Sequence, residues 1–466
     1  QTVDGDPSGN SNAPVEHYRK TVRADEAYEW KTTLFSGEET WYWERIRQND
    51  IFFPYTTTVS AVATGGPQAI VRGEIVSNVN NSSIEDDHHS KIYFNSTIAT
   101  IDDHWWSGKS RYSFEREINN NPATIFNGTN TLRVFMEKTD EILAPDYYFD
   151  WFEIEYNRLF VAEDNAIEFT STETGTQKYQ VTGFTDIANP MVLDTTDPNE
   201  PKWIQNSSAQ SGAVEISLTH PDEISIAMAT GDIDLLHDQI SYYVPPNWNA
   251  LNAGFDYVYI THNDLLTSAE ELANYRSGKG LSTIVVDIKD LYNEFHFGIY
   301  HPIAIKNFLA YAFDNWEVDP TYALLVGDGH WNFHDYNLTK YGSGPQYLPP
   351  HLVWVDPWQG EVDSANLLAT IVGEDAFPDL MIARLPVNSE AEIDAYLSKL
   401  ESYEAAHIPE AWEQNHTFVV DNADSRGAFE HYADDIIDKF ITPISFASDI
   451  QIYQDDFGCT SWSSTE

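Results

Sequence analysis

Hydrophobic and polar residues alternate in short runs through the first part of the chain. Residues 70–76, 131–136 and 152–156 place apolar side chains at nearly every second position, and Gly, Asn and Pro separate such runs. A period of two is typical of strands with one buried face. We therefore expect a β-sandwich, jelly-roll-like in its connections, over residues 30–169. Residues 1–29 are polar and acidic with little periodicity, which predicts a flexible lead-in.

A second β-rich segment follows the predicted sandwich. Residues 214–218 and 224–228 alternate in the same way and predict a small β domain over residues 170–248. The sequence Pro245-Pro246-Asn247-Trp248 then indicates a linker, because proline and asparagine favour turns over regular elements. This composition places a domain boundary near residue 250.

Beyond residue 250 the period of the pattern changes. Short continuous apolar runs at 257–260, 283–286 and 322–326 alternate with segments of helical spacing. One predicted helix begins at Pro302 and places apolar side chains on a single face. Strand, helix, strand, helix and strand in this order favour a parallel sheet with right-handed crossovers. We expect this α/β subdomain to occupy residues 249–411.

The run at 322–326 ends abruptly in Gly327-Asp328-Gly329, where glycine lets the backbone turn into a loop above the sheet edge. In open α/β sheets that edge is where ligands bind. Residues 379–387 predict another strand, and 417–421 begin a second α/β unit over residues 412–466. This second unit has too few elements to close a sheet alone. We expect it to pack on the preceding unit or on polypeptide outside this sequence.

The net charge excludes two classes of partner. The chain has 25 Lys and Arg against 74 Asp and Glu, so 25 − 74 = −49. Such a charge repels phosphate backbones and anionic membrane surfaces, and we expect no nucleic-acid partner. The acidity indicates a solubilising, salt-adapted surface or, alternatively, calcium binding by clustered carboxylates. No complete twelve-residue calcium loop is present, so the first interpretation is preferred for most of these charges.

Several features favour an exported protein. No apolar run approaches the length of a membrane-spanning helix, and the chain begins at Gln1 without an initiator Met. The chain also carries seven Asn-X-Ser/Thr triplets. We expect a secreted or cell-surface glycoprotein whose leader has been removed. The triplets begin at Asn80, Asn81, Asn95, Asn127, Asn206, Asn337 and Asn415.

Three segments carry a resemblance to a known family. The stretches "YALLVGDG", "VDSANLLATIVGEDAFPDLMIARLPV" and "AEIDAYLSKLESYE" occur in this order after residue 320. Their order and spacing are similar to the first half of gingipain-type cysteine peptidase domains, from Asp256 to the end of the chain. The resemblance implies a caspase-like, doubly wound α/β fold, peptide substrates and no required cofactor. It also implies that the catalytic histidine and cysteine lie beyond Glu466, so that this chain alone is inactive.

The resemblance suggests roles for residues of the second α/β unit. Asp421 matches the position where gingipain-type enzymes place an acidic residue against the catalytic histidine, or else it only caps the turn before the next helix. Asp424 and Ser425 lie just beyond and are candidates for a specificity pocket. The single cysteine, Cys459, lies outside the position of the family nucleophile, and we expect it to be a half-buried structural side chain.

The calcium candidates lie in the first α/β unit. Asp328, Asp363 and Asp375 each stand in a turn-like sequence, and gingipain-type domains resemble calcium users. Turn capping explains the same pattern, because aspartate beside glycine commonly bonds its own backbone. Calcium is therefore an optional ligand in this interpretation.

Aromatic and histidine clusters have two interpretations each. Trp105 and Trp106 are either a sugar-stacking platform or sandwich packing, and packing is preferred. His88 and His89 resemble a metal cluster, although a solvated loop is preferred. Residues 330–359 form either a binding surface or a structural loop packed by its own aromatic side chains.

The leading hypothesis is the amino-terminal portion of an exported gingipain-like cysteine peptidase. It would be completed by the carboxyl-terminal remainder of the same protein or by a second chain. The alternative is a non-catalytic extracellular or cell-surface structural glycoprotein that keeps the peptidase scaffold. A third hypothesis is an unrelated α/β enzyme that uses the Gly327-Asp328-Gly329 loop.

Overall fold

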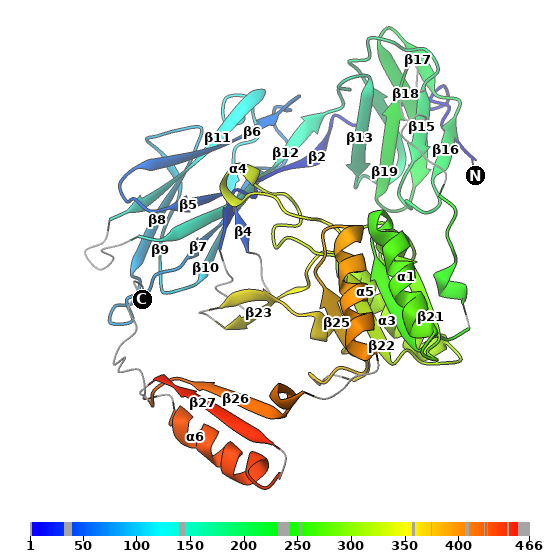
Figure 1. Ribbon diagram of the computed structural model, residues 1–466. Coiled ribbons are helices and arrows are strands. Elements are labelled where there is room, and N and C mark those ends of the chain that lie inside the picture. The colour runs from blue at the N-terminus through cyan, green and yellow to red at the C-terminus, as the bar shows by residue number, and fades with distance from the viewer. Residues whose placement is uncertain are drawn as a thin grey trace. The chain divides into compact units, whose positions relative to one another are not determined.

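A computed structural model describes most of the chain, which divides into two compact units, Gln1–Asn388 and Ser389–Glu466 (Figure 1). Each unit is considered by itself below. None of the helices in the described segments is long and apolar enough to cross a bilayer. The described residues are 2–31, 40–138, 145–231, 243–251, 253–356, 359–373, 375–405, 410–423, 425, 427–444 and 447–454.

The first unit contains the predicted β-sandwich. One sheet has the strand order β10-β7-β12-β2, with β5 also paired to β12, and the other has the order β6-β11-β8-β9. Apolar side chains of both sheets, such as Val71, Phe152, Ile92 and Leu132, form one buried core. The jelly-roll connectivity stays a prediction. The strands are β2 (His17–Asp25), β5 (Glu44–Ile46), β6 (Phe52–Val59), β7 (Ala69–Ser77), β8 (His88–Phe94), β9 (Thr100–Trp106), β10 (Arg111–Ile118), β11 (Gly128–Glu137) and β12 (Tyr147–Leu159).

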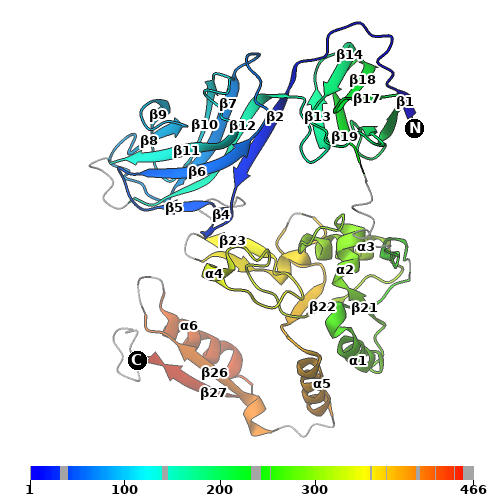
Figure 2. The same ribbon diagram turned by 90° about the horizontal axis from the view of Figure 1, so that it is seen from above.

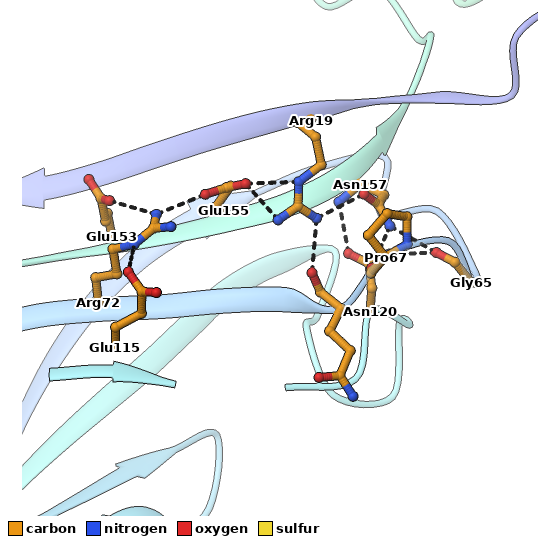
Figure 3. A network of polar contacts seen from close by, with 10 residues as sticks. Arg19, Gly65, Pro67, Arg72, Glu115, Asn120, Glu153, Glu155 and Asn157 are labelled. Carbon is orange, nitrogen blue, oxygen red and sulfur yellow. Dashed lines mark hydrogen bonds and ion pairs between the residues drawn. The ribbon is translucent and has the colours of Figure 1, made fainter. Parts of the chain in front are cut away.

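The β10-β7-β12-β2 sheet bears a row of charged side chains (Figure 3). Arg72 bonds to Glu115 at 2.5 Å, to Glu153 at 3.1 Å and to Glu155 at 2.8 Å. Arg19 joins the row through a 2.7 Å contact with Glu155. Hydrogen bonding to Glu115 is the main cause of a raised pKa for Arg72. Shared partners of this kind keep half-buried carboxylates charged in a chain with few cations.

The small β domain has a core of its own and includes the amino terminus. Its core contains Phe169, Val181, Ile216 and Ile226. Figure 1 shows the amino terminus beside β16, and Thr2 pairs in parallel with Trp203. The strands are β1 (Thr2–Asp4), β13 (Ala166–Ser171), β14 (Gly175–Val181), β15 (Met191–Asp194), β16 (Lys202–Gln205), β17 (Ser208–Gln210), β18 (Ala213–His220) and β19 (Ile224–Ala229).

The predicted flexible lead-in is therefore wrong. Residues 2–4 form β1, and residues 17–25 form β2, which pairs along its whole length with β12. Both are edge strands whose side chains are only partly buried, so their sequences lack the apolar alternation that identifies inner strands. The core of the small β domain also includes Phe160, so the transition from the sandwich lies earlier than the predicted residue 169.

The α/β part of the first unit has the predicted parallel sheet. Its order is β21-β20-β22-β25, and every neighbouring pair is parallel. Figure 2 shows α1 on one face of the sheet and α2 with α3 on the other. The elements are β20 (Tyr257–Thr261), α1 (Leu266–Ser277), β21 (Thr283–Asp287), α2 (Ile288–Phe295), α3 (Ile303–Asn315), β22 (Tyr322–Val326) and β25 (Met381–Leu385).

The core under α3 follows the predicted helical face. Ile305, Phe308 and Leu309 are fully buried against Ile260 and Leu325 of the sheet. An antiparallel hairpin that the sequence did not indicate is inserted between β22 and β25. It consists of β23 (Leu352–Asp356) and β24 (Gly360–Asp363), and a short helix, α4 (Leu338–Tyr341), precedes it.

The second unit is small and has much exposed apolar surface. Its strands β26 (Asn415–Val420) and β27 (Ser448–Tyr453) pair in parallel, and α6 (Phe429–Ile436) lies beside them (Figure 2). Val419, Tyr432 and Phe440 are 75%, 56% and 65% exposed. This unit also contains α5 (Glu390–Glu404), which the sequence assigned to the preceding subdomain, a short helix at Ala411–Gln414, and a turn of π-helix at Ile437–Ile441.

Two carboxyl groups and one guanidinium meet on the charged face of the sandwich. Asp150 is 5% exposed and lies beside Glu74, while Arg111 bonds to Glu74 and lies 3.5 Å from Asp150. Burial, together with the neighbouring charge of Glu74, raises the pKa of Asp150 to about 8. Asp150 is therefore protonated at neutral pH in the folded chain.

We predict that Asp150→Asn removes a pH dependence of stability. The unfolded carboxyl loses its proton near its ordinary pKa of 3.8, whereas the folded carboxyl keeps it up to about pH 8. The folded state thus binds more protons in this window, and its stability falls as the pH rises, by at most about 1.4 kcal/mol per pH unit. Urea unfolding between pH 5 and 8 should show a shallower decline for the variant. Asp222→Asn, at an exposed position of the small β domain, is the matched control and should keep the wild-type slope.

Candidate functional site

The parallel sheet brings the carboxyl ends of its strands to one edge. Thr261 of β20 pairs with Val326 of β22, which pairs with Leu385 of β25, so the three strands end in register. The strand order reverses at β20, because β21 lies on one side of it and β22 on the other. Crevices at such a reversal are the usual ligand sites of open α/β sheets. His262 follows β20 there, with its ring 5.7 Å from that of Tyr347.

The Gly327-Asp328-Gly329 turn has the strict backbone requirement that the sequence indicates. Gly327 has a φ of 140°, and a Cβ at Gly329 would lie 2.1 Å from the carbonyl oxygen of Leu348. Only glycine permits this close approach of two backbone segments. Asp328 accepts a 2.9 Å hydrogen bond from the Gly329 N–H and a 3.4 Å bond from the Asn388 amide. It therefore supports the turn at the rim.

Arg384 is a buried cation beneath this rim. Its guanidinium donates to the carbonyl oxygens of Gly327 and Leu348 at 3.2 Å and to that of Pro349 at 3.4 Å. Its Nε lies 3.4 Å from Asp363, without the geometry of a hydrogen bond. Burial lowers the pKa of Arg384, although Asp363 and Asp328 oppose that effect. Arg384 was not among the predicted site residues. The sequence feature that indicates its role is its position as the one cation inside the apolar run at 381–385.

The three calcium candidates lie in different surroundings. Asp363 accepts a 2.9 Å bond from the His351 N–H and faces Arg384, and Asp375 accepts a 2.9 Å bond from the Phe377 N–H. These contacts are the turn and loop contacts that the alternative interpretation predicts. In the described part of the chain, no group of three or more His, Cys, Asp or Glu side chains is arranged to hold a metal ion. Calcium binding stays an untested prediction.

The segment after β22, which we call the rim loop (residues 330–347), is held by one buried amide. The Asn332 side chain is 1% exposed. It donates to the Tyr336 carbonyl at 2.7 Å and accepts from the Tyr336 N–H at 3.0 Å. Gln346 adds a 3.4 Å bond to the Asn332 carbonyl. The rim loop is thus internally bonded, as expected for a loop that presents a defined surface.

A hairpin of the amino-terminal region packs on the rim loop within the first unit. Its strands, β3 (Glu29–Trp30) and β4 (Trp41–Tyr42), pair with each other. The Trp41 ring stacks on Trp331 at 5.9 Å, and the Trp30 ring lies 4.6 Å from Trp331. Lys340 bonds to Glu29 at 2.5 Å, and the Tyr341 hydroxyl accepts a 2.8 Å hydrogen bond from the Trp30 N–H. These contacts explain why the first compact unit continues through the boundary predicted near residue 250.

The histidine and tryptophan pairs of the sandwich lie in strands β8 and β9. His88 is fully buried, and burial lowers its pKa. His89 contacts Asp103 at 2.6 Å and Glu137 at 2.5 Å, and its ring stacks on Trp105 at 4.1 Å. The expected solvated loop is therefore wrong for these histidines, because strand pairing buries them. Trp106 is 6% exposed and Trp105 49%, so packing accounts fully only for Trp106.

In the second unit, Asp421 directly follows β26, as the sequence predicts. Its side chain accepts a 2.7 Å bond from the Asn422 N–H and lines a hollow of about 280 Å³ together with Val420 and Ile452. The Ser425 side chain is exposed. Asp424 and Cys459 lie outside the described residues.

The seven candidate glycosylation sites differ in how their amide nitrogens are used. Asn80 is exposed, whereas the Asn95 amide donates to Thr124 at 2.9 Å and to Asn130 at 2.7 Å. Asn337 donates to the Tyr28 carbonyl at 2.8 Å, and Asn206 to Asp4 at 2.9 Å. Asn127 and Asn415 are exposed and Asn81 is half-buried. A glycan replaces one hydrogen of this nitrogen, so Asn95 is the site least compatible with modification.

Comparison with known families gives a match in the second half of the chain. Residues 250–465 match the model of peptidase family C25. The match confirms the resemblance to gingipain-type cysteine peptidases over that part of the sequence. No curated protein matches the chain.

One solved structure has a similar fold over most of the chain. The crystal structure of dimeric latent PorU from Porphyromonas gingivalis matches with a TM-score of 0.60 and 15% identity. The match covers 87% of this chain but only 39% of the PorU chain. It supports a multidomain, β-rich architecture.

Two further matches carry no argument because their TM-scores are low. The CBM36-1 domain of a multidomain xylanase from the hindgut metagenome of Trinervitermes trinervoides has a TM-score of 0.19 at 13% identity, covering 29% of this chain and 95% of that domain. The structure of infectious bursal disease virus Gx strain has a TM-score of 0.20 at 8% identity, covering 53% of this chain and 52% of that chain.

We predict that Arg384→Met destabilises the first unit by about 3–5 kcal/mol, because it leaves Asp363 and the carbonyls of the rim without their buried partner. Arg384→Lys keeps the charge but not the planar set of donors, and should give a smaller loss. Urea unfolding followed by circular dichroism measures both. Arg23→Ala, which breaks an exposed ion pair, is the control and should change stability by at most about 1 kcal/mol. Equal losses for Arg384→Met and Arg23→Ala would contradict the role of Arg384.

Proposed function

Because residues 250–465 match peptidase family C25, we propose that this chain is the amino-terminal part of an exported, gingipain-like cysteine endopeptidase. That match is the observation that carries the proposal. The parallel order β21-β20-β22-β25 and its rim support it, since a caspase-like core is an α/β layer of this kind. The likeness to PorU over 87% of the chain agrees with β domains that precede the peptidase part.

The proposed chemistry needs groups that the described residues do not bring together. A cysteine peptidase uses a thiolate, a histidine that accepts and returns the proton, and donors for the oxyanion. The sequence has one cysteine, Cys459, away from the family position. We place the catalytic cysteine and histidine on sequence beyond Glu466, and Asp421 as the residue that orients the histidine. Asp424 and Ser425 would line the specificity pocket beside them.

The exposed apolar surface of the second unit supports an additional partner. Val419 on β26 and Ile450 and Ile452 on β27 are 75%, 43% and 38% exposed on a sheet of two strands. Two strands with one helix bury too little apolar surface for independent stability. The carboxyl-terminal remainder of the same protein, or a second chain, would cover this surface with further strands.

The alternative function is a non-catalytic extracellular structural glycoprotein on the same scaffold. Its support is the surface position of several glycosylation triplets, including exposed Asn80, Asn127 and Asn415. Calcium, held by residues such as Asp328, Asp363 or Asp375, would serve either function as a stabiliser of loops. A secreted or cell-surface location fits both.

We predict that a peptidyl acyloxymethyl ketone probe labels the longer natural protein but not residues 1–466 alone. The probe requires a thiolate in a substrate-binding site, so it separates a peptidase from a structural protein. Cys459→Ser in the longer protein should leave labelling unchanged, which controls for the cysteine of this chain. Asp421→Asn should lower kcat/KM by about tenfold or more through loss of histidine orientation. Absence of labelling in the longer protein would favour the structural glycoprotein.

We predict that glycan attachment in a glycosylating host distinguishes Asn80 from Asn95. The exposed Asn80 should be modified, whereas Asn95 should be unmodified in folded protein because Thr124 and Asn130 occupy both of its N–H groups. Glycopeptide mass spectrometry measures the occupancy of each. High occupancy at Asn95 in protein with native circular dichroism would contradict this assignment.

A further inference from the structure

A pocket of about 280 Å³ lies beside the rim of the parallel sheet in the first unit. The rim loop supplies Trp331 and Phe333, and the amino-terminal hairpin supplies Trp41. Pro302, at the start of α3, and Pro350 are buried and contribute to the lining. The pocket is thus lined mainly by aromatic rings and prolines.

Its size limits the ligand. Pockets that take whole drug-sized molecules measure about 300–1,000 Å³, and this one lies at the lower end of that range. Its volume and its ring-lined walls suit one large, flat, apolar group. Aromatic groups gain both from burial and from offset or edge contacts with other rings.

The polar lining of the pocket includes histidine rings and the carboxyl group of Glu361. His301 and His351 line it, and burial lowers the pKa of both. Neutral imidazoles donate and accept single hydrogen bonds, as a peptide group requires. The His301 Nδ1 accepts a 3.2 Å bond from the Ile303 N–H, so its Nε2 carries the proton and is a donor.

The walls are held in place before any ligand arrives. Asn332 fixes the turn of the rim loop through its two bonds to Tyr336, and Trp41 stacks on Trp331. Because the walls are already ordered, binding of a ligand costs less conformational entropy of the protein.

A strand begins at the edge of the pocket. Leu352 is both a lining residue and the first residue of β23. Among the described residues, β23 pairs only with β24, so the hairpin is a two-stranded sheet. An extended peptide adds to a strand edge of this kind through main-chain hydrogen bonds, while its side chains enter adjacent pockets.

We propose that this pocket binds an aromatic side chain of an extended peptide that lies along the β23–β24 hairpin. The site rests on the peptidase function proposed above, for which it would act as an additional specificity site. The net charge of −49 makes acidic peptides poor ligands.

The test measures binding by the full 466-residue chain, without turnover. Isothermal titration compares blocked pentapeptides that differ only at the central residue, which is Phe, Ala or Lys. The Phe peptide should bind about tenfold or more tightly than the Ala peptide. Equal affinities, or preference for the Lys peptide, would overturn the proposal.

Variants locate the binding site. Phe333→Ala should weaken binding of the Phe peptide by about tenfold or more, and Phe377→Ala is the matched control, because Phe377 is 78% exposed and outside the pocket. Leu352→Trp fills the pocket instead of emptying it and should also abolish the preference for Phe. The melting temperature of each variant shows whether it folds. Unchanged binding in folded Phe333→Ala and Leu352→Trp would place the peptide elsewhere.

The experiments above test the proposed function and the proposed peptide site independently of each other. If the probe fails to label the longer protein but the Phe peptide binds here, the peptidase function is wrong and the pocket is a peptide site of a non-catalytic protein. If the probe labels the longer protein but no preference for Phe exists, the peptidase function holds and the aromatic site is wrong.

Discussion

The close approach of two backbone segments at Gly329 determines what the edge of the parallel sheet can present. The Leu348 carbonyl occupies the space that a side chain at residue 329 would need. The end of the rim loop therefore packs directly against the turn that follows β22. Arg384 then donates to the carbonyls of both segments from below. A buried guanidinium with several acceptors fixes geometry more strictly than apolar packing does. The rim loop, its aromatic contacts and the adjacent pocket all depend on this arrangement.

The few cationic side chains of this protein include some that contact several acidic side chains at once. The acidic side chains outnumber the basic ones by 74 to 25, so few cations are available to pair with them. Three glutamates gather around Arg72, of which Glu153 and Glu155 are partly buried and Glu115 is exposed. Where no cation suffices, as at Asp150, the carboxyl keeps its proton instead. Both arrangements avoid the cost of burying an unpaired charge.

The order of elements was predictable from sequence because period and turn chemistry are local properties. The strands at 257–260, 283–286 and 322–326 and the helix after Pro302 occur as predicted. The edge strands β1 and β2 were missed, since half-exposed strands need no apolar alternation. The β23–β24 hairpin was missed because β23 lies within residues 330–359, a long segment rich in Tyr, Pro, Trp and His that was predicted to be a loop.

The candidate site was only partly predictable, because its contacts join distant residues. The sequence placed Gly327-Asp328-Gly329 and Asp421 at strand ends, where they are found. It gave no means of pairing Trp41 with Trp331, or Arg384 with the carbonyls of Leu348 and Pro349. His88 and His89 show the opposite error. The polar run around them, next to two glycosylation triplets, indicated solvent, whereas pairing of β8 with β9 and β11 encloses them.

The strand at the amino terminus has a consequence for biosynthesis. Thr2 pairs with Trp203, so residues 2–4 have no partner until the sandwich and most of the small β domain have been made. Contacts of such long sequence separation form late and slow folding. Strand β1 therefore joins its sheet only after synthesis of the sandwich, whose sequence interrupts that of the small β domain.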